Sequence, residues 1–298
     1  MISRCYLEIT NVCNLKCIFC AGHRREPRVM SADEFEILTD RLRGKVRFLY
    51  FHLMGEPLMN PLLPLFITRA RAKGFIPVVT TNGTLLCGQS SSISQMAAGL
   101  AESGPYKVNI SLHSHEGNPD APAMTLDNYL ASVAGFAKHA ASENVIVVLR
   151  LWNNGGYDSE NEKIIEILHR YLPDEWTCHD RGAKIADRIF LEYDSMFDWP
   201  DDNTEEYGED VFCYALRNQF GVLVDGSVVP CCLDHDGSMT LGNLFAQPLE
   251  EILASERAGR IYDGFTRHKA VEPLCRRCGY ALITKQYRLA SGSGDKKR

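Results

Sequence analysis

Three cysteines near the N-terminus have the type and spacing of ligands for a metal cluster. Cys13, Cys17 and Cys20 form a C-x3-C-x2-C sequence in a loop directly after the first predicted strand. Three thiolates can hold three irons of a [4Fe–4S] cluster and leave the fourth iron open to a chelating ligand. A zinc knuckle is the alternative, and it would need a fourth ligand nearby, for which His23 is the candidate.

A second group of cysteines lies in the last third of the chain. Cys213 is followed by the adjacent Cys231 and Cys232 and then by a C-x2-C pair, Cys275 and Cys278. This set can supply four thiolate ligands to one iron–sulfur cluster. A structural zinc site with four cysteines would use the same ligands, so the spacing leaves both open. Three further cysteines have no partners in spacing and are expected to be buried as small hydrophobic side chains: Cys5, Cys87 and Cys178.

The composition favours a cytoplasmic protein that uses its thiols as ligands. The chain has 298 residues and eleven cysteines, a high count for a reducing compartment in which disulfides are rare. The N-terminus enters a strand-like segment at once and lacks the layout of a signal peptide, which predicts a cytoplasmic location. No apolar run reaches the length of a membrane-spanning helix. A net charge of −6 argues against a nucleic-acid partner, because such proteins usually carry a basic face.

Strands and helices alternate over residues 1–193 and must position the first cysteine group. Apolar residues recur every three or four positions in the predicted helices, as in Phe35, Leu38 and Leu42. The strands between them are short and rich in Val, Ile and Phe, as in a parallel sheet that is buried on both faces. Six such units predict an α/β fold, a partial (β/α)6 barrel with its chemistry at the carboxyl ends of the strands. The predicted strands are 5–10, 46–53, 76–81, 107–112, 145–151 and 188–193, and the predicted helices are 32–43, 61–73, 91–103, 126–142 and 161–171.

After the barrel, the pattern changes to that of a small α+β cap. The linker between barrel and cap holds eight carboxylates and no lysine or arginine, so we expect it to be solvated. Asp225 and Gly226 form a turn sequence that is typical of a β-hairpin. The polar tail of the chain is expected to be disordered. The predicted segments are the linker 194–210, the cap 211–290 with hairpin strands 220–224 and 227–230 and a helix over 248–260, and the tail 291–298.

The first cysteine group resembles the ligand sequence of the radical S-adenosylmethionine (SAM) superfamily. As in that family, an aromatic residue, Phe19, stands directly before the last cysteine. The resemblance implies that the open iron of a [4Fe–4S] cluster binds the amino and carboxylate groups of SAM. Electron transfer would then cleave SAM to methionine and a 5′-deoxyadenosyl radical, which abstracts a hydrogen atom from the substrate. An electron donor of the flavodoxin or ferredoxin type is implied as a partner.

Residues at the ends of later strands resemble further family positions around SAM. Gly55, Glu56 and Pro57 resemble the segment whose carbonyls and carboxylate pair with the SAM ammonium group. Asn82, in a Thr-Asn-Gly sequence, and Ser111, on the fourth strand, match two more of these positions. The Gly-Glu-Pro and Asn-Gly sequences could also be ordinary turns.

Other polar side chains on the barrel strands are candidates for contact with SAM or with the substrate. Arg150, which shares a face of the fifth strand with Trp152, could hold the SAM carboxylate or pair with a structural acid. Polar and apolar residues alternate on the fourth strand, so one of its faces is expected to line a site. His113 follows on that face and could meet substrate or be a hydrogen-bonded structural residue. His52 and Glu192 are weaker catalytic candidates.

The second cysteine group resembles the twitch module, a shortened form of the SPASM iron–sulfur domain. The resemblance covers residues 211–280. A full SPASM domain with two clusters needs about seven cysteines, and five are present, which implies one auxiliary [4Fe–4S] cluster. Cys232 would be a spare thiol on the other face of its strand. The expected ligands are Cys213, Cys231, Cys275 and Cys278.

The cysteine spacing of the cap is similar to that of radical SAM dehydrogenases that oxidise an alcohol. Four cysteine ligands leave no open iron, so the auxiliary cluster would accept an electron from the substrate radical without binding the substrate. The resemblance therefore implies a two-electron oxidation of a small molecule. A maturase that forms thioether or carbon–carbon links in a peptide is the alternative within the family. A non-enzymatic metal-binding or redox-sensing protein is an alternative of another class, and it would need no SAM site.

Overall fold

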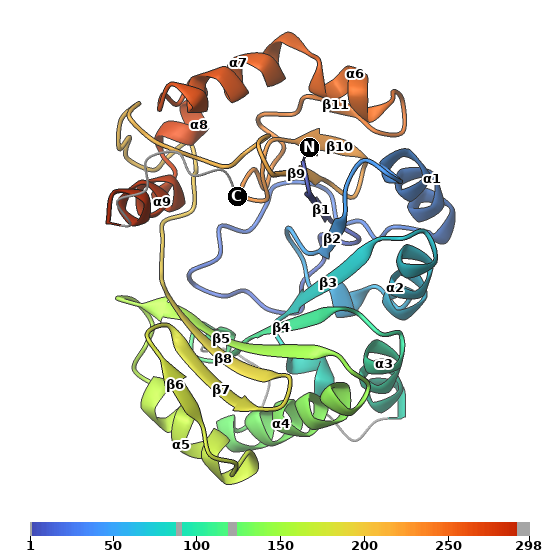
Figure 1. Ribbon diagram of the computed structural model, residues 1–298, viewed down its shortest axis with the longest axis vertical. Helices are drawn as coiled ribbons and strands as arrows, with labels where there is room; N and C mark the ends of the chain where they lie inside the picture. The colour runs from blue at the N-terminus through green and yellow to red at the C-terminus, as the bar shows by residue number, and fades with distance from the viewer. Residues whose placement is uncertain (1, 88–90, 119–123, 291–298) are drawn as a thin grey trace.

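The barrel strands pair in parallel and curve around an open inner side, in a computed structural model that describes residues 2–87, 91–118 and 124–290. This is the predicted partial barrel. Its strands are β1 (Arg4–Leu7), β2 (Phe48–Phe51), β3 (Ile76–Thr81), β4 (Lys107–Ser111), β5 (Ile146–Asn154) and β8 (Ile189–Ser195), and its helices are α1 (Ala32–Leu42), α2 (Leu63–Ala72), α3 (Ser91–Glu102), α4 (Leu126–Ser142) and α5 (Asn161–Tyr171). Figure 1 shows the helices outside the curved sheet and the long blue loop after β1 on its inner side.

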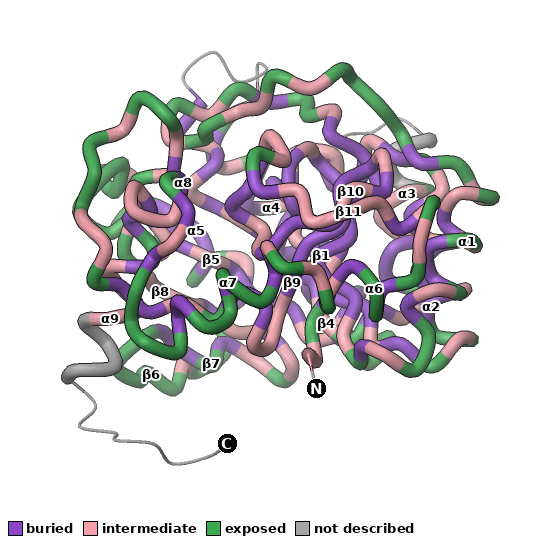
Figure 2. Tube along the Cα trace, turned by 90° about the horizontal axis from the view of Figure 1, so that it is seen from above, coloured by how far each residue is buried: buried purple, intermediate pink, exposed green. Residues whose placement is uncertain are grey.

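Local sequence explains where the barrel helices begin and which face they bury. Ser31 caps α1: its side chain accepts a hydrogen bond from the backbone N–H of Glu34, and the Glu34 carboxylate accepts one from the Ser31 backbone. Phe35, Leu38 and Leu42 are fully buried, as their spacing predicts. Figure 2 shows buried residues along the central strands and exposed residues on the outer helices and loops. Every helix in the described ranges is too short or too polar to span a lipid bilayer.

An antiparallel ribbon that the sequence did not indicate precedes the last barrel strand. Strands β6 (Thr177–His179) and β7 (Gly182–Ala186) pair with each other, and β7 pairs with β8. All residues of β6 are exposed, so the apolar pattern that marks a buried strand is missing there. Cys178 lies on β6 and is exposed, which corrects the expectation that it is buried, whereas Cys5 and Cys87 are buried as expected.

The cap continues the barrel sheet. It contains β9 (Gln219–Val222), β10 (Ser227–Val229), β11 (Gly242–Asn243), α6 (Leu249–Leu253), α7 (Glu256–Thr266), α8 (Pro273–Arg276) and α9 (Gly279–Ala290). Strand β9 pairs in parallel with β1, so that Cys5 lies opposite Phe220. The hairpin turn between β9 and β10 has Gly226 at φ +83°, a conformation that favours glycine. The described strands thus form one 11-stranded sheet in the order β11-β10-β9-β1-β2-β3-β4-β5-β8-β7-β6.

The helix predicted over 248–260 is two helices, α6 and α7. The chain breaks between them because Ser255 caps α7, where its side chain accepts a hydrogen bond from the backbone N–H of Ala258. The apolar pattern in the sequence did not show this break, since buried residues recur on both sides of it, as Leu249 and Ile252 in α6 and Ala258 and Ile261 in α7. The tail 291–298 lies outside the described residues.

The acidic segment 194–210 is not solvated throughout, which corrects the expectation from its charge. Its first residues belong to β8. Phe197 and Trp199 pack against the hydrophobic core, and Pro200 is buried. These apolar residues alternate with the carboxylates, so the segment turns its aromatic side inward and its acidic side to solvent.

Candidate functional site

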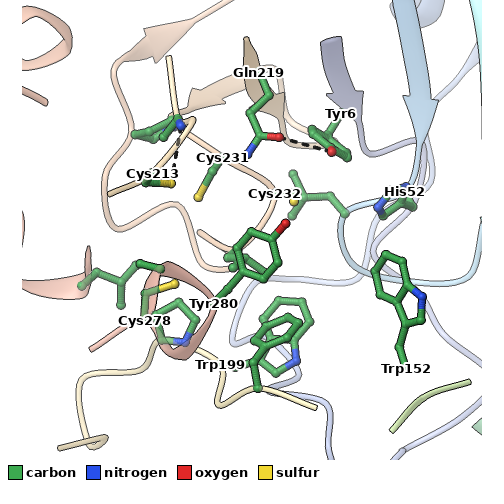
Figure 3. A pocket seen from close by; sticks show the side chains of 18 of the residues that line it. Tyr6, His52, Trp152, Trp199, Cys213, Gln219, Cys231, Cys232, Cys278 and Tyr280 are labelled. Carbon is green, nitrogen blue, oxygen red and sulfur yellow. Dashed lines mark hydrogen bonds between the residues drawn. The ribbon is translucent and has the colours of Figure 1, made fainter. Parts of the chain in front are cut away.

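A cavity joins the mouth of the barrel to the cap. It has a volume of about 330 Å³ and is lined from the first cysteine loop, from the carboxyl ends of barrel strands and from the cap. Figure 3 shows the cap cysteines on one side of it, His52 and Trp152 of the barrel on the other, and Tyr280 between them. Both cysteine groups contribute to the lining, through Cys20 of the first group and through Cys213, Cys231, Cys232, Cys275 and Cys278 of the second.

Backbone hydrogen bonds shape the loop that carries the first cysteine group. The N–H of Cys20 donates to the carbonyl of Cys17 at 3.0 Å. The backbone N–H groups of Leu15 and Gly22 donate to the sulfur atoms of Cys13 and Cys20, each at 3.5 Å. Hydrogen bonds of this kind to cysteine sulfur tune iron–sulfur clusters. Burial is the main cause that raises the pKa of Cys17 to about 12, and the neighbouring thiols of Cys20 and Cys13 contribute to that rise.

A structural zinc site is the alternative to an iron–sulfur cluster at these thiol groups. In residues 2–87, 91–118 and 124–290, no three Cys, His, Asp or Glu side chains are close enough to hold one metal ion, whereas a structural zinc site needs a tight tetrahedron of four. His23, the candidate fourth zinc ligand, lies with its Nε2 2.8 Å from the backbone oxygen of Asn11.

Phe19 lines the cavity next to the last cysteine of the loop. Its ring lies 5.1 Å from the ring of His113, between centroids. A Cβ atom at Gly117 would collide with the Phe19 ring, and the Gly117 carbonyl accepts a hydrogen bond from the N–H of Ile18 at 2.7 Å. Gly117 therefore leaves room for the Phe19 ring and holds this part of the loop by a backbone hydrogen bond. A single glycine in a polar loop gives no sequence signal for such a role.

Gly55 lies where the end of β2 meets the first cysteine loop. It has φ +73°, and a Cβ atom there would collide with the backbone of Thr10 and Asn11. Both properties require glycine. The close approach brings the segment predicted to bind the SAM ammonium group directly against the loop that carries Cys13.

Replacing Gly55 with alanine is expected to weaken SAM binding about tenfold or more, because left-handed backbone costs a non-glycine residue about 1–2 kcal/mol even without the collision. Equilibrium binding of SAM to the anaerobically reconstituted protein measures this. Gly135 in α4 is the matched control, since a Cβ atom there meets nothing within 4 Å. Equal SAM affinity in the Gly55→Ala and Gly135→Ala variants would contradict the role given to Gly55.

Glu56 joins the ends of three chain segments. Its N–H donates to the carbonyl of Val12 at 2.9 Å, and its carboxylate accepts hydrogen bonds from the backbone N–H of Asn82 at 2.7 Å and of Leu58 at 3.1 Å. Burial raises the pKa of Glu56 to about 7, and these N–H groups oppose that rise. The Asn82 side chain in turn donates to Asn14 at 3.0 Å. Of the residues predicted to bind SAM, the cavity lining includes Phe19, Ser111 and Arg150 but not Gly55, Glu56, Pro57 or Asn82.

The end of β4 places polar groups beside β5. Ser111 lies opposite Arg150 in the sheet register. His113 follows in a short 3-10 helix, Leu112–Ser114, and its Nδ1 lies 3.2 Å from the Arg150 carbonyl and 3.4 Å from the N–H of Trp152. Burial lowers the pKa of His113 to about 4, so its ring is neutral at pH 7. The side chain of His113 is therefore held in place by backbone groups of β5 and also lines the cavity.

Arg150 is the charged side chain among the described residues that line the cavity. Its guanidinium lies over the ring of Trp152 at 4.1 Å. Its Nε is buried without a hydrogen-bond partner and lies 3.6 Å from the Glu192 carboxylate. A cation held in this way has room for an anionic ligand such as a carboxylate. Glu192 is not among the residues that line this cavity, and the structure places it as a neighbour of Arg150.

His52 is the other imidazole at the cavity. Its ring stands edge-on to Tyr6, with centroids 5.1 Å apart. Burial is the main cause that lowers its pKa to about 3, and the charge of Arg150 contributes to the decrease, so His52 is neutral at pH 7. Its Nδ1 is buried and has no hydrogen-bond partner. Buried polar atoms are normally satisfied, and a polar group of a ligand in the cavity could supply this partner.

The cap cysteines converge at the far side of the cavity. Burial raises the pKa of Cys231 well above its usual range, and the thiols of Cys213, Cys232, Cys275 and Cys278 raise it further because they lie nearby. Backbone N–H groups at the start of α9 oppose a similar rise in the pKa of Cys278. Buried thiols with N–H donors around them suit the ligands of an iron–sulfur cluster.

Cys232 faces the barrel side of this group. After burial, its thiol is the largest cause that raises the pKa of Tyr6 and of Tyr280. Figure 3 shows Cys231 beside Cys213 and Cys232 on the side of Tyr6 and His52. This arrangement supports Cys231 as the ligand and leaves Cys232 as a thiol exposed to the cavity.

Exchanging Cys231 and Cys232 separately for alanine separates their roles. We expect the Cys231→Ala variant to lose about four of about eight irons per chain after reconstitution, and the Cys232→Ala variant to keep all of them. Iron and sulfide analysis measures both. The opposite pattern, with iron lost only from the Cys232→Ala variant, would reverse the assignment.

Aromatic residues that the sequence did not single out complete the cavity wall. Tyr6, Trp199 and Tyr280 all line it, and the Tyr6 hydroxyl lies 3.3 Å from the Gln219 side chain, which ties β1 to β9. Trp199 lies in the segment expected to be a solvated linker. The sequence did offer one signal for this role, which is the presence of a tryptophan in an otherwise acidic segment. Large aromatic side chains are usually at least partly buried.

Known proteins with similar sequences and structures cover nearly the whole chain. The S-adenosyl-L-methionine-dependent 2-deoxy-scyllo-inosamine dehydrogenase of Niallia circulans is 23% identical over 307 residues, which cover 95% of each protein. A probable GTP 3′,8-cyclase of Methanothermobacter thermautotrophicus is 27% identical over 278 residues, which cover 77% of this chain and 84% of the cyclase. The crystal structure of BtrN in complex with AdoMet and 2-DOIA aligns with a TM-score of 0.58 at 18% identity over 93% of each chain, so the fold is shared.

Two family profiles match the two parts of the chain. The profile of the radical SAM superfamily matches residues 7–181, more than half of the chain. The profile of SPASM, an iron–sulfur cluster-binding domain, matches residues 213–279. Both resemblances inferred from the cysteine spacing are thereby confirmed. The chain is an enzyme of the radical SAM superfamily, with a [4Fe–4S] cluster and SAM in its barrel and an iron–sulfur-binding SPASM domain as its cap.

Proposed function

We propose that this enzyme oxidises a small molecule by two electrons, with hydrogen-atom abstraction at the barrel mouth and transfer of the second electron to one auxiliary cluster in the cap. The observation that carries the proposal is the single cavity that Cys20 and the cap cysteines both line. A substrate held there would lie between the site of radical formation and the electron acceptor. The similarity to a dehydrogenase over 95% of each protein supports an oxidation.

The residues divide into three binding sets. Four cap thiolates would occupy all positions of the auxiliary cluster, so substrate would be held by side chains alone. When bound, the cofactors supply a one-electron reductant, a 5′-deoxyadenosyl radical that accepts a hydrogen atom, and an acceptor for one electron. The sets are Cys13, Cys17 and Cys20 for the first cluster, Phe19, Gly55, Glu56, Pro57, Asn82, Ser111 and Arg150 for SAM, and Cys213, Cys231, Cys275 and Cys278 for the auxiliary cluster.

The cavity wall suits the oxidation of an alcohol. In such a reaction the substrate loses a hydrogen atom from carbon, a proton from its hydroxyl group and one further electron, and becomes a ketone. His52 and His113 are neutral, so they can accept a hydrogen bond from a hydroxyl group without placing a charge beside it. Aromatic side chains from barrel and cap exclude water, which would give a substrate radical a competing reaction partner.

The test uses the reconstituted enzyme with SAM, a chemical reductant and a panel of secondary alcohols deuterated at the carbinol carbon. Cyclitols, aminocyclitols and sugar alcohols form the panel, and short peptides form a second set. We expect a panel member to give one ketone per 5′-deoxyadenosine, with deuterium in the 5′-deoxyadenosine. Return of the alcohol with a solvent hydrogen at carbon would overturn the proposal, and a cross-linked peptide would establish the maturase instead.

The partners follow from the same proposal. We expect a flavodoxin- or ferredoxin-like protein to supply the electron for SAM cleavage, and we expect the enzyme to act in the cytoplasm. Reduction of the first cluster by purified flavodoxin, followed by its EPR signal, tests the donor. Small-molecule substrates are favoured because the names of the two curated relatives refer to small molecules.

A further inference from the structure

A buried carboxylate, that of Glu8, lies at the junction of barrel and cap. Glu8 directly follows β1 and has no exposed surface. Its carboxylate accepts two hydrogen bonds from the guanidinium of Arg25, at 2.6 and 2.7 Å. It accepts two more from backbone N–H groups, those of Met54 at 3.2 Å and Val224 at 2.9 Å. One side chain is therefore fully satisfied by three separate parts of the chain.

Arg25 continues the connection into the cap. Its side chain is 15% exposed, and its Nε donates to the carbonyl of His235 at 2.8 Å. The neighbouring residue strengthens this link, since the N–H of Arg24 donates to the carboxylate of Asp236 at 2.7 Å. The loop that carries the first cysteine group is thus bound at two consecutive residues to the cap loop that follows Cys232.

Arg25 and the backbone groups that hydrogen-bond to Glu8 and Arg25 lie close in sequence to the cofactor sites and to the cap hairpin. Arg25 is five residues after Cys20, and His235 is three residues after Cys232. Met54 directly precedes Gly55, and Val224 lies in the turn of the cap hairpin, two residues after the end of β9. A bidentate arginine–carboxylate pair fixes both distance and orientation, which a lysine cannot do. The network therefore joins the first cluster loop, the SAM segment and the auxiliary cluster loop through two side chains.

We propose that the Glu8–Arg25 pair couples the two cofactor sites, so that SAM binding in the barrel depends on assembly of the cluster in the cap. When the cap thiols are drawn onto one cluster, the loop after Cys232 is fixed, and its His235 carbonyl holds Arg25. Arg25 then holds the first cysteine loop against Glu8. The coupling does not depend on which reaction the enzyme catalyses, and the two residues act as positioning residues.

A double-mutant cycle tests the coupling through SAM affinity. The first change is Cys275→Ser with Cys278→Ser, which removes the auxiliary cluster. The second is Arg25→Lys, which keeps the positive charge but removes the guanidinium that donates two hydrogen bonds to Glu8. We expect loss of the auxiliary cluster to weaken SAM binding about tenfold in the otherwise wild-type enzyme and less than about twofold in the Arg25→Lys background. Equilibrium dialysis with labelled SAM measures the affinity, and the EPR change of the first cluster on SAM addition is a second readout.

Arg28→Gln is the matched control. Arg28 lies on the same loop and pairs with Glu34, but this pair is exposed and does not reach the cap. The tenfold effect should persist in that background. Equal effects in the wild-type and Arg25→Lys backgrounds, or no effect of the cap variant on SAM affinity, would overturn the proposal.

Glu8→Gln provides a second route to the same measurement if the Arg25→Lys protein does not fold. It keeps the shape of the side chain and places an N–H₂ group against the N–H donors of Arg25 and Val224. Loss of the first cluster from both variants, with the cluster retained in Arg28→Gln, would show that the pair maintains the loop itself. That outcome would also overturn the proposed coupling.

Discussion

Replacing Cys13, Cys17 and Cys20 together with alanine is expected to lower the iron content of the reconstituted protein from about eight atoms per chain to about four. The cap thiols lie on a separate set of elements and should keep their cluster. Production of 5′-deoxyadenosine should fall to background, because no iron remains to bind SAM. Iron and sulfide analysis, with chromatography of the SAM products, measures both effects.

Two outcomes of this experiment would contradict the cofactor assignment. Zinc in place of iron in the wild-type protein would remove the radical chemistry and leave a structural site. Four irons in the wild type that persist in the triple variant would place the only cluster in the cap. A Cys178→Ser variant is the control for thiol replacement, since Cys178 is exposed on β6, apart from both groups.

Loss of the auxiliary cluster is expected to abolish oxidation of the substrate while SAM cleavage continues. In the Cys275→Ser/Cys278→Ser variant we expect about four irons per chain and continued formation of 5′-deoxyadenosine at saturating SAM. No ketone should form, because the substrate radical has lost its electron acceptor. Quantifying 5′-deoxyadenosine and ketone in the same reaction gives the ratio directly.

A ketone yield equal to that of the wild type would show that the auxiliary cluster is not the acceptor. Loss of both products would show that the cap is needed for the first step as well. The Cys232→Ala variant serves as the comparison here, since it changes a thiol at the same cavity while leaving the four expected ligands in place. Its ratio of ketone to 5′-deoxyadenosine should remain that of the wild type.

The barrel could be predicted from sequence because its elements are marked by local patterns. The helices Leu126–Ser142 and Asn161–Tyr171 and the strand Ile76–Thr81 have the predicted bounds. The two helices have regularly spaced apolar residues, and the strand is a short apolar segment that ends at an Asn-Gly turn sequence. The ribbon at Thr177–His179 could not be predicted in this way. It is exposed and short, and only its pairing with β7 makes it a strand.

The site was predictable where covalent chemistry sets the spacing and unpredictable where packing sets it. Cys13, Cys17 and Cys20 fall on one short loop, and Cys275 and Cys278 are three residues apart, so these ligand patterns can be recognised in the sequence. Glu8, in contrast, could be seen only as a polar residue in an apolar strand. Its partners Met54, Val224 and Arg25 are distant in sequence and meet it only in the folded chain.

The parallel pairing of β9 with β1 has a consequence for the modular structure of the enzyme. Removing the cap would leave β1 as an open edge with unpaired backbone groups, which favours aggregation. The first cysteine loop begins only a few residues after that edge. A chimera that exchanges the cap with that of another enzyme must therefore retain a strand that matches the register of β1, and the natural point of exchange lies outside the sheet, in the segment between β8 and β9.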